Sequence, residues 1–344
     1  MLPDPSGVGF LASSTQVAVV LDWGGTWARA AVIDRDGEIL WQSRVANPKN
    51  PTQILLLESA DGLLGEAISW CAGRPIAGVG LAIAGPVDAE TGTLFDPPNL
   101  PALNGVSLKA RWEPLVGCPV WVGNDANLAA LGEYHYGAGL DAARQGTPSR
   151  TLVYLTVSTG IGGGVVDRER VFLGASGLAA EIGHMIIDRS ESAFQCECGN
   201  RGCLEALASG TAIARIAWAG LAGPDSQDSV LASEAVESIT SASVFQAASQ
   251  GDVLANNVLE RAVLALSVGL TNVLHLFNPD LVVLGGGVTV GLTELDYLPR
   301  IRSLTLQQAM SQRHKDFRLV ASRLGDEAGM VGAAAMVWKE VDGG

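Results

Sequence analysis

The chain has 344 residues and a formal net charge of −14, and its composition is 48% hydrophobic and 17% charged. This length exceeds what one hydrophobic core usually serves, so we expect two domains. The negative charge, with no run of Lys or Arg, argues against a nucleic-acid partner, because an acidic surface repels phosphate backbones. A small anionic ligand is compatible with this charge if backbone N–H groups and a metal ion bind it.

The N-terminus and the cysteine content indicate a cytoplasmic protein that does not span a membrane. Residues 1–16 have neither a basic start nor an apolar core of signal-peptide length. The longest apolar stretch, Ala262 to Phe277, is too short and too interrupted for a membrane span, and we interpret it as a buried helix. Five cysteines in a chain of this length do not form a disulfide framework, so we expect reduced thiols.

Strands and helices alternate along the chain, which predicts the α/β class. The opening segment is a meander of three strands separated by turns. The elements predicted for the first part of the chain are strands over 17–21, 28–34 and 38–45, a helix over 53–70, strands over 78–85 and 120–125, and a helix over 126–136.

The segment from Leu152 to Gly174 repeats the order of the opening meander, with a buried strand, a turn of Thr and Gly, and two further strands. This self-similarity predicts two lobes of the same design. The elements predicted after it are a helix following Glu205, a polar surface loop over 223–243 with room for one helix, a long helix from the N-cap Asp252 to Asn278, strands over 281–287 and 317–325, and a helix over 326–341.

Three of the five cysteines lie within eight residues, at Cys196, Cys198 and Cys203, and His184 lies twelve residues before the first of them. Three thiolates and one imidazole form a standard four-coordinate zinc set. The alternative is three buried structural cysteines, but free cysteines rarely cluster in a turn. A catalytic zinc is less favoured, because four protein ligands leave no open position for water. We therefore expect a structural zinc ion that fixes a loop carrying polar groups.

Two glycine-rich turns each follow a predicted buried strand. Gly24, Gly25 and Thr26 form the first turn, and Thr159 and Gly160 form the second. Glycine lets backbone N–H groups point at phosphate oxygens, and Thr hydroxyl groups add donors. Either turn alone could be a plain hairpin, but the pair favours phosphate binding. The sequence contains no GxxxxGK[ST] motif, which excludes a Walker-type loop.

Two aspartates at the ends of predicted strands are candidates for chemistry. Asp22 ends the first strand and can hold Mg²⁺ directly or through water. Asp125 follows one strand and precedes a helix, inside the motif GNDAN. Its residue type and position are equally compatible with a general base and with the N-cap of the helix that begins at Ala126.

Five motifs occur in a fixed order: LDWGGTWAR (21–29), NDAN (124–127), STGIGGG (158–164), EIGH (181–184) and CECGNRGCLE (196–205). Together they resemble the ROK family of sugar kinases and sugar-responsive regulators over nearly the whole chain. The resemblance implies the actin-like ATPase (ribonuclease H-like) fold, with two lobes of duplicated design and a cleft between them. Residues 1–125 with 326–344 would form the small N-terminal lobe, and residues 126–325 the large C-terminal lobe.

The resemblance also implies ATP, Mg²⁺ and a hexose, with the hexose bound in the cleft. Asp125 would be the general base that accepts the proton of the sugar hydroxyl as this hydroxyl attacks the γ-phosphate. His184 would bind zinc with one ring nitrogen and face the sugar with the other. The implied sugar-contacting residues are Asn99, Asn124, Asp125, Glu181, His184 and Glu205. The implied nucleotide and Mg²⁺ residues are Asp22, Gly24, Gly25, Thr26, Thr159, Gly160, Gly285 and Gly286.

Three residues depart from the family pattern. Ser158 and Ala180 stand where glycine is usual, and because both are small we expect slightly altered turns without loss of function. Trp23 replaces an aliphatic residue, and the sequence offers no account of it. For Gly287, after the strand that carries Gly285 and Gly286, a plain strand-and-turn role stays open.

The cysteine loop and the following ASGTAIAR resemble the glucokinase branch most, so we expect a kinase that forms glucose 6-phosphate, as a homodimer in the manner common in the family. N-acetylglucosamine and N-acetylmannosamine kinases share all these motifs and are the alternatives. A regulator of this family would carry an N-terminal helix-turn-helix domain, and about sixteen residues before the first strand are too few for one. An actin-like scaffold or chaperone ATPase would need no zinc loop.

Overall fold

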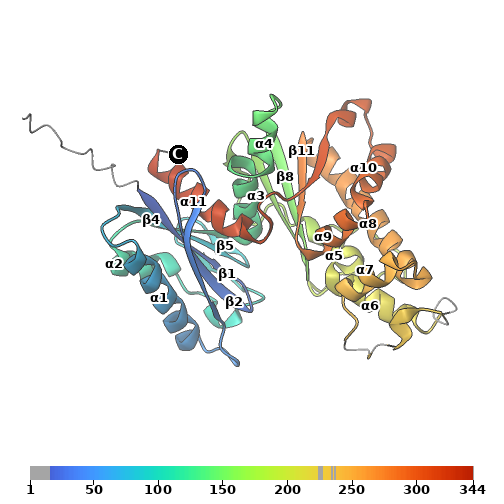
Figure 1. Ribbon diagram of the computed structural model, residues 1–344, viewed down its shortest axis with the longest axis horizontal. Helices are drawn as coiled ribbons and strands as arrows, with labels where there is room; N and C mark the ends of the chain where they lie inside the picture. Colours follow the sequence, from blue (N-terminus) through green and yellow to red (C-terminus); the bar gives the residue numbers. More distant parts are fainter. Residues whose placement is uncertain (1–15, 224–227, 234, 236–237, 344) are drawn as a thin grey trace, which may run out of the picture. The chain divides into compact units, whose positions relative to one another are not determined.

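The computed structural model describes residues 16–223, 228–233, 235 and 238–343. The segment before residue 16, expected to lack a signal peptide, and part of the polar stretch after Gly223 lie outside the described residues. The chain divides into two compact units. One contains the residues up to Asp125 together with the segment from Gly329 onward, and the other contains Ala126–Ala328. Each unit contains its own five-stranded sheet (Figure 1).

The sheet of the first unit has the order β3-β2-β1-β4-β7. The first three strands in the chain pair antiparallel as the predicted meander, and β1, β4 and β7 run parallel. The strands are β1 (Val17–Trp23), β2 (Trp27–Ile33), β3 (Ile39–Ala46), β4 (Ile76–Ile83) and β7 (Val120–Asn124), with a separate short hairpin of β5 (Val87–Asp88) and β6 (Thr93–Leu94). Because β1 is central and covered on both faces, all its residues except Asp22 are buried.

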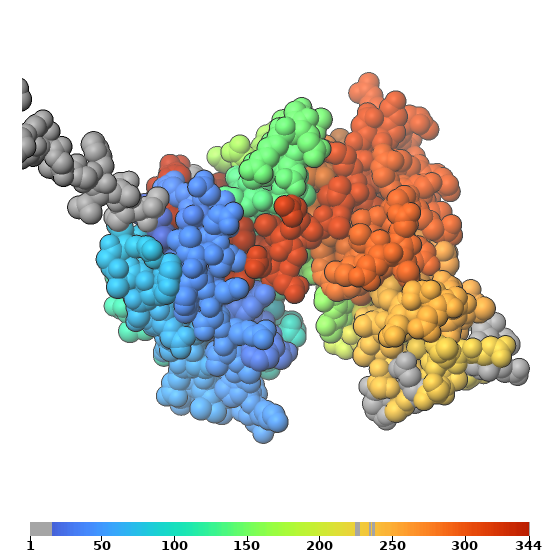
Figure 2. All heavy atoms as spheres, viewed as in Figure 1, coloured from blue at the N-terminus to red at the C-terminus, as the bar shows by residue number. Residues whose placement is uncertain are grey.

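Helices cover the sheet of the first unit. They are α1 (Gln53–Trp70), α2 (Leu108–Val116) and α11 (Ala328–Val341). The Thr52 hydroxyl caps α1, and α1 packs along β1, β2 and β3 and lies at the surface in Figure 2. A Cβ atom at Gly80 of β4 would lie 2.5 Å from the carbonyl oxygen of Ala333 in α11. Glycine therefore allows α11 to lie directly on β4, as the Ala- and Gly-rich sequence of this helix predicts.

The sheet of the second unit has the order β10-β9-β8-β11-β12, which repeats the topology of the first sheet strand for strand. Its strands are β8 (Thr151–Val157), β9 (Ile161–Asp167), β10 (Arg170–Val171), β11 (Leu281–Gly285) and β12 (Arg318–Ala321). Again three strands form an antiparallel meander, and again the first of them continues into a parallel set. The repetition confirms the prediction of two lobes of the same design.

The long helix α8 (Val253–Phe277) is the centre of the second unit's core. The Asp252 carboxylate accepts the Ala255 N–H at its start, and Asn278 ends it in a left-handed conformation. Its length and composition would suit a membrane span, but 61% of its most apolar stretch is buried inside the protein. This confirms the interpretation of the apolar segment 262–277 as a buried helix.

The other helices of the second unit pack around α8 or on the sheet. They are α3 (Asp125–His135), α4 (Ala138–Arg144), α5 (Glu205–Ala208), α6 (Gly210–Gly220), α7 (Ser241–Ser249), α9 (Gly287–Glu294) and α10 (Tyr297–Gln308). Helices α5, α6, α7 and α10 contact α8, and α6, α7 and α10 form visible surface in Figure 2. The sequence did not predict α2, α4, α9 or α10: α2 contains a proline, and α9 begins inside the triple-glycine turn.

A buried carboxylate fixes both segments that lead to the boundary between the two units. Glu133 of α3 is fully buried. Its Oε2 accepts the Ala138 N–H (2.8 Å), and its Oε1 accepts the Leu324 N–H (2.9 Å) and the Ser322 hydroxyl (2.5 Å). Helix α3 begins where the chain enters the second unit, and residues 322–324 precede the point where it leaves. Glu133 therefore holds the two crossing segments together within the second unit.

Candidate functional site

The parallel strands of the first unit end in register at one edge of the sheet. Trp23 at the end of β1 pairs with Ile83 of β4, which pairs with Asn124 of β7. Neighbouring strands lie about 4.8 Å apart, so the segments that follow β1 and β7 begin roughly 10 Å from each other. The predicted phosphate turn and Asp125 both follow this edge, which is where open α/β sheets bind ligands.

The first turn connects β1 and β2. The Gly24 N–H donates to the Trp27 carbonyl (3.0 Å), which closes the turn. The side chain of Asn47, just after β3, braces it by donating to two of its carbonyl oxygens. A Cβ atom at Gly25 would lie 3.0 Å from the Cβ atom of Asn99, so the turn and the predicted sugar-contacting Asn99 lie against each other.

Asp22 is held by a cross-strand ion pair. It pairs with Arg29 in the β1–β2 register, and the guanidinium group contacts Oδ2. The side chain of Asp22 is 13% exposed, so the pair is largely shielded from water. A guanidinium group on one carboxylate oxygen competes with direct Mg²⁺ coordination. The donor set therefore fits a hydrated Mg²⁺ held through water, one of the two modes that the sequence predicts.

Asn124 and Asp125 form the junction of β7 and α3. The Asn124 amide donates to the Gly85 carbonyl (3.4 Å), which connects it to the end of β4. Helix α3 includes Asp125 as its first residue, whereas the N-cap alternative placed the helix start at Ala126. The N-terminal end of a helix is a favourable place for a carboxylate, because the backbone N–H groups there point toward it.

The second turn connects β8 and β9 and is attached to the start of α6. The Ser158 N–H donates to the Gly160 carbonyl (2.9 Å), and the Gly210 N–H donates to the Ser158 carbonyl (2.7 Å). The Thr211 hydroxyl donates to the Thr159 carbonyl (2.9 Å). These bonds involve only the backbone of Ser158, so this departure from the family pattern leaves the turn closed.

Glu205 connects the second turn to the cysteine loop. Its Oε2 accepts the Ile161 N–H at 2.8 Å, and its Oε1 lies 3.6 Å from the Cys196 sulfur. A Cβ atom at Gly160 would lie 2.6 Å from Oε2. Glycine at 160 thus leaves room for the carboxylate, a reason for this glycine that the sequence did not reveal.

The EIGH segment packs on the same strand end. A Cβ atom at Gly183 would lie 2.0 Å from the Ile161 carbonyl oxygen, so no other residue fits. Ala180 has φ = +66°, a left-handed conformation that explains why glycine is usual there. Glu181 is exposed, yet partial desolvation among the surrounding atoms raises its pKa, while the nearby His184 lowers it.

The four predicted zinc ligands converge. The ligand atoms of His184, Cys196, Cys198 and Cys203 all lie within 4.8 Å of one another. The Cys198 and Cys203 sulfurs are 3.7 Å apart, and so are the Cys196 sulfur and His184 Nδ1. A disulfide would bring two sulfurs to about 2.05 Å. Tetrahedral Zn–S bonds of about 2.3 Å place them about 3.8 Å apart. The distances therefore fit a shared metal ion.

Two glycines shape the cysteine loop. Gly199 and Gly202 both have positive φ, at +91° and +77°. The Cys196 N–H donates to the Asn200 carbonyl (2.8 Å), and the Ile187 N–H donates to the Gly202 carbonyl (2.8 Å). A Cβ atom at Gly202 would lie 1.8 Å from the Asp188 carbonyl oxygen. The backbone alone therefore folds the loop back onto the segment after His184.

The thiols of the loop have different acidities. Burial raises the pKa of Cys196 to about 12 and also raises the pKa of Cys203, whereas hydrogen bonding from the Asn200 backbone lowers the pKa of Cys198. Buried thiols with raised pKa values stay protonated at neutral pH unless a cation stabilises the thiolates. The loop thus combines preformed geometry with thiols that a bound soft cation would hold as thiolates.

Gly285 and Gly286 are predicted to lie against adenosine. Packing within the second unit also requires glycine at both positions. A Cβ atom at Gly285 would lie 2.2 Å from the Tyr154 hydroxyl, and one at Gly286 would lie 2.5 Å from the Val157 carbonyl oxygen. Gly287 is exposed and has open space around its Cβ position. The first two glycines let the end of β11 and the start of α9 lie close to β8.

Each unit therefore gathers its own part of the predicted set. In the first unit these residues follow the carboxyl ends of β1 and β7 or contact the first turn: Asp22, Gly24, Gly25, Thr26, Asn99, Asn124 and Asp125. In the second unit they surround the end of β8 and the start of β9: Thr159, Gly160, Glu181, His184, Glu205, Gly285 and Gly286. Asn47 and Ile161 were not predicted, because each contributes through contacts with distant segments.

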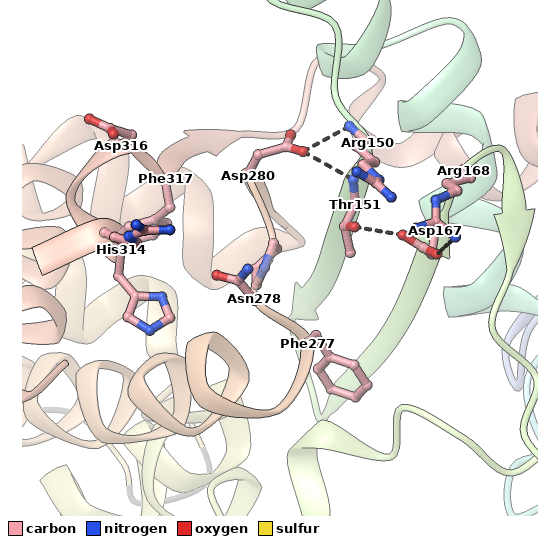
Figure 3. Close-up of a pocket in the computed structure, with 12 residues that line it drawn as sticks. Arg150, Thr151, Asp167, Arg168, Phe277, Asn278, Asp280, His314, Asp316 and Phe317 are labelled. Carbon is pink, nitrogen blue, oxygen red and sulfur yellow. Dashed lines mark hydrogen bonds and ion pairs between the residues drawn. The ribbon is translucent and has the colours of Figure 1, made fainter. Parts of the chain in front are cut away.

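A cavity of about 430 Å³ lies elsewhere in the second unit. Figure 3 shows Asp280 between the Arg150 and Thr151 backbone N–H groups, which donate to it at 2.8 and 3.1 Å. Thr151 begins β8, and Asp280 directly precedes β11, so the cavity lies at the amino ends of these parallel strands. The candidate residues lie at the carboxyl ends, and the cavity is separate from them.

A model of the ROK family matches residues 18–340. The protein belongs to the ROK family. Glucokinase of Thermotoga maritima is 32% identical over 94% of this chain and 98% of its own length. N-acetylmannosamine kinase of Citrobacter koseri is 33% identical over 92% of this chain and 97% of its own length.

Two solved structures show the same fold as this ROK protein. A ROK family glucokinase from Streptomyces griseus, in complex with glucose and AMPPNP, has a TM-score of 0.75 and 32% identity, covering 93% of this chain and 98% of that one. A ROK family transcriptional regulator has a TM-score of 0.83 and 28% identity, covering 96% of this chain and 80% of that one. The predicted actin-like ATPase fold is confirmed.

The strain at Ala180 gives a stability prediction. A left-handed alanine costs about 1–2 kcal/mol, and a glycine adds about 0.5–1 kcal/mol of unfolded-state entropy. We expect Ala180→Gly to raise the free energy of unfolding by about 0.5 kcal/mol, measured by urea denaturation of the purified protein. Ala179→Gly is the matched control, because Ala179 has no positive φ, and this variant should lose about 0.5–1 kcal/mol. Equal losses in both variants would contradict the argument.

Proposed function

We propose that this ROK protein is an ATP-dependent hexose kinase that phosphorylates the 6-hydroxyl group, with glucose as its preferred substrate. The observation that carries the proposal is a Gly- and Thr-containing hairpin turn at the same position of both sheets, between β1 and β2 and between β8 and β9. Paired turns of this kind suit the phosphate groups of a nucleotide. The similarity to a glucokinase solved with glucose and AMPPNP supports the same assignment.

Each unit has its own candidate nucleotide-binding residues. Gly24, Gly25 and Thr26 would offer backbone and hydroxyl donors from the first turn, and Thr159 and Gly160 from the second. Asp22 would hold Mg²⁺ through water, since Arg29 already contacts the carboxylate. When bound, Mg²⁺ neutralises charge on the β- and γ-phosphate oxygens. Gly285 and Gly286 would present a surface without side chains to the adenosine.

Asp125 would act as the general base. The 6-hydroxyl oxygen forms a bond to the γ-phosphorus while the bond from this phosphorus to the departing ADP oxygen breaks. The hydroxyl proton passes to the Asp125 carboxylate. Its place at the start of α3, directly after β7, holds the carboxylate on a rigid element. Proton transfer to a positioned base typically contributes about 10²–10⁴-fold to the rate.

The residues proposed to orient the sugar carry amide, carboxylate and imidazole groups. Asn99 and Asn124 belong to the first unit, and Glu181, His184 and Glu205 belong to the second. A carboxylate has about four acceptor positions, so Glu205 can accept sugar hydroxyl groups while it keeps its bond from the Ile161 N–H. His184 Nδ1 faces Cys196, which leaves Nε2 for the sugar.

A zinc ion bound by His184, Cys196, Cys198 and Cys203 would be structural. Support comes from the tetrahedral ligand spacing and from the preformed backbone of the loop. Four protein ligands complete the coordination and leave no position for a reacting water. The ion would fix the loop from which Glu205 reaches the second turn.

The proposed function also implies a cellular location and a set of partners. Free thiols, a candidate metal site of cysteine ligands and MgATP as the proposed co-substrate support a cytoplasmic location. We also propose a homodimer, because members of the family commonly form dimers. Its substrates would be small molecules, so nucleic acid and membranes have no role in the reaction.

An N-acetylhexosamine kinase is the second candidate function. The observation in its favour is the 33% identity to an N-acetylmannosamine kinase, which is within one percentage point of the 32% identity to a glucokinase. N-acetylglucosamine is included because the motifs do not separate the two sugars. A non-catalytic sugar-responsive regulator is the third, in view of the regulator with the same fold. A regulator would bind sugar without turnover, and so a sugar-dependent release of ADP separates it from both kinases.

The metal site gives one prediction. Elemental analysis of the purified protein should find one zinc ion per chain. Cys203→Ser should lose the metal and bind hexose more weakly, because a structural zinc ion contributes several kcal/mol to its loop, on the order of 10 kcal/mol in zinc peptides. Cys118→Ser is the control, because Cys118 lies outside the cluster and its variant should keep one zinc ion. Wild-type protein without zinc would disprove the site.

The base gives a second prediction. Asp125→Asn should fold and bind hexose normally, but its kcat should fall by at least about 100-fold, because the amide keeps the shape and cannot accept the proton. Steady-state kinetics and hexose binding by calorimetry measure the two effects. Asp141→Asn, which changes a half-exposed aspartate of α4, serves as the control and should keep its kcat. A near wild-type kcat in Asp125→Asn would leave Asp125 as a structural or sugar-binding residue.

Substrate preference gives a third prediction. Acceptors held by a braced loop cannot relax when a sugar hydroxyl is missing, and an unpaired buried acceptor costs about 1–3 kcal/mol, or one to two decades in kcat/KM. We therefore expect kcat/KM to be higher for glucose than for fructose and 2-deoxyglucose, measured under saturating MgATP. The panel also includes mannose and both N-acetylhexosamines. If an N-acetyl sugar has a kcat/KM at least tenfold above that of glucose, the kinase assignment stands but glucose is not the preferred substrate.

A further inference from the structure

Asn47 uses both ends of its side chain on the first turn. Its Nδ2 donates to the carbonyl oxygens of Gly24 and Gly25, both at 2.8 Å. Its Oδ1 accepts the indole N–H of Trp23 at 3.1 Å, and its backbone N–H donates to the Thr26 carbonyl at 2.8 Å. One residue therefore contacts every peptide of the turn that is predicted to bind phosphate.

These contacts decide where the N–H groups of the turn point. In a planar trans peptide the C=O and N–H bonds point in opposite directions. Asn47 holds the Gly24 and Gly25 carbonyls on its own side, so the N–H groups of Gly25 and Thr26 point to the other side. Among the described residues, neither N–H donates to an acceptor, and both residues are exposed. The turn thus presents two aligned donors.

Trp23 determines how the Asn47 amide is oriented. An indole N–H is only a donor, so the Asn47 oxygen must face Trp23 and the NH₂ group must face the turn. Trp23 is itself fixed, because it is 1% exposed and stacks on Trp112 with 6.4 Å between ring centroids and 16° between planes. The Trp112 N–H donates to Asp61 at 2.8 Å. An aliphatic residue at 23 would pack in the core but could not orient Asn47.

We propose that Asn47, oriented by Trp23, is a positioning residue for nucleotide binding: it aims the Gly25 and Thr26 N–H groups at the phosphate oxygens of ATP. The inference rests on the proposed kinase function and adds residues to it. Backbone donors held before the ligand arrives bind better, because no ordering cost falls on the binding step. The proposal also gives Trp23 a role.

The test compares three variants in nucleotide binding and turnover. Asn47→Ala removes all the side-chain bonds, and Asn47→Asp keeps the shape and the acceptor for Trp23 but loses both donors. Trp23→Phe keeps an aromatic ring in the core but removes the indole N–H together with the smaller ring that carries it. MgATP affinity is measured by calorimetry without hexose, and KM is measured for MgATP and for glucose separately. We expect Asn47→Ala and Asn47→Asp to weaken MgATP binding about tenfold or more, with the glucose KM within twofold. Trp23→Phe should weaken it about threefold.

Asn256→Ala is the matched control. Asn256 also donates from Nδ2 to two backbone carbonyls, those of Asp252 (2.8 Å) and Ala248 (3.4 Å), but it lies in α8. This variant should lose stability and keep its MgATP affinity. If folded Asn47→Ala binds MgATP as wild type does, or if its two KM values rise equally, the inference fails while the kinase stands. If wild-type protein does not bind MgATP at all, the proposed function and the inference both fail.

Discussion

Three candidate segments of the second unit depend on the backbone of one residue, Ile161. Its N–H donates to Glu205, and its carbonyl oxygen lies where only a glycine at 183 leaves space. The second turn, the EIGH segment and the cysteine loop therefore meet at a single residue, although they are far apart in sequence. Because a buried N–H without a partner costs about 1–3 kcal/mol, none of the three segments can shift alone. Any ion that fixes the cysteine loop would also fix the turn.

The two sheets share a topology, but their hairpin turns are braced differently. In the first unit β3 has eight residues and pairs up to Trp27, so the residue after it, Asn47, reaches the turn. In the second unit the equivalent strand β10 has two residues and pairs only at the far end of β9. No residue after β10 can take the place of Asn47 there. The start of α6 braces the second turn instead, because the Gly210 N–H and the Thr211 hydroxyl donate to its carbonyl oxygens.

The sequence predicts elements whose ends are marked by local chemistry. The predicted helix over 53–70 matches α1, and the predicted caps Asp252 and Asn278 bound α8. The four proposed zinc ligands are recognisable because they are scarce residue types at short spacing. Asn47 leaves no such mark: its contact with a turn 22 residues earlier exists only once the register of β2 and β3 is fixed. Contacts set by strand register cannot be read from a local pattern.

The glycine-rich motif STGIGGG also combines features that a local pattern reveals with contacts that only the fold sets. In the sequence STGIGGG is one continuous motif, of which Thr159 and Gly160 are predicted to bind phosphate, and the structure gives its glycines separate roles. Gly160 leaves room for Glu205, whereas Cβ atoms at Gly162 and Gly164 would lie 3.2 and 2.5 Å from atoms of Ala126 in α3. Helix α3 can therefore lie directly on β9, with the buried Glu133 fixing its later turns. The first residue of that helix is Asp125, so the close packing at these two glycines sets where the helix of the proposed base begins.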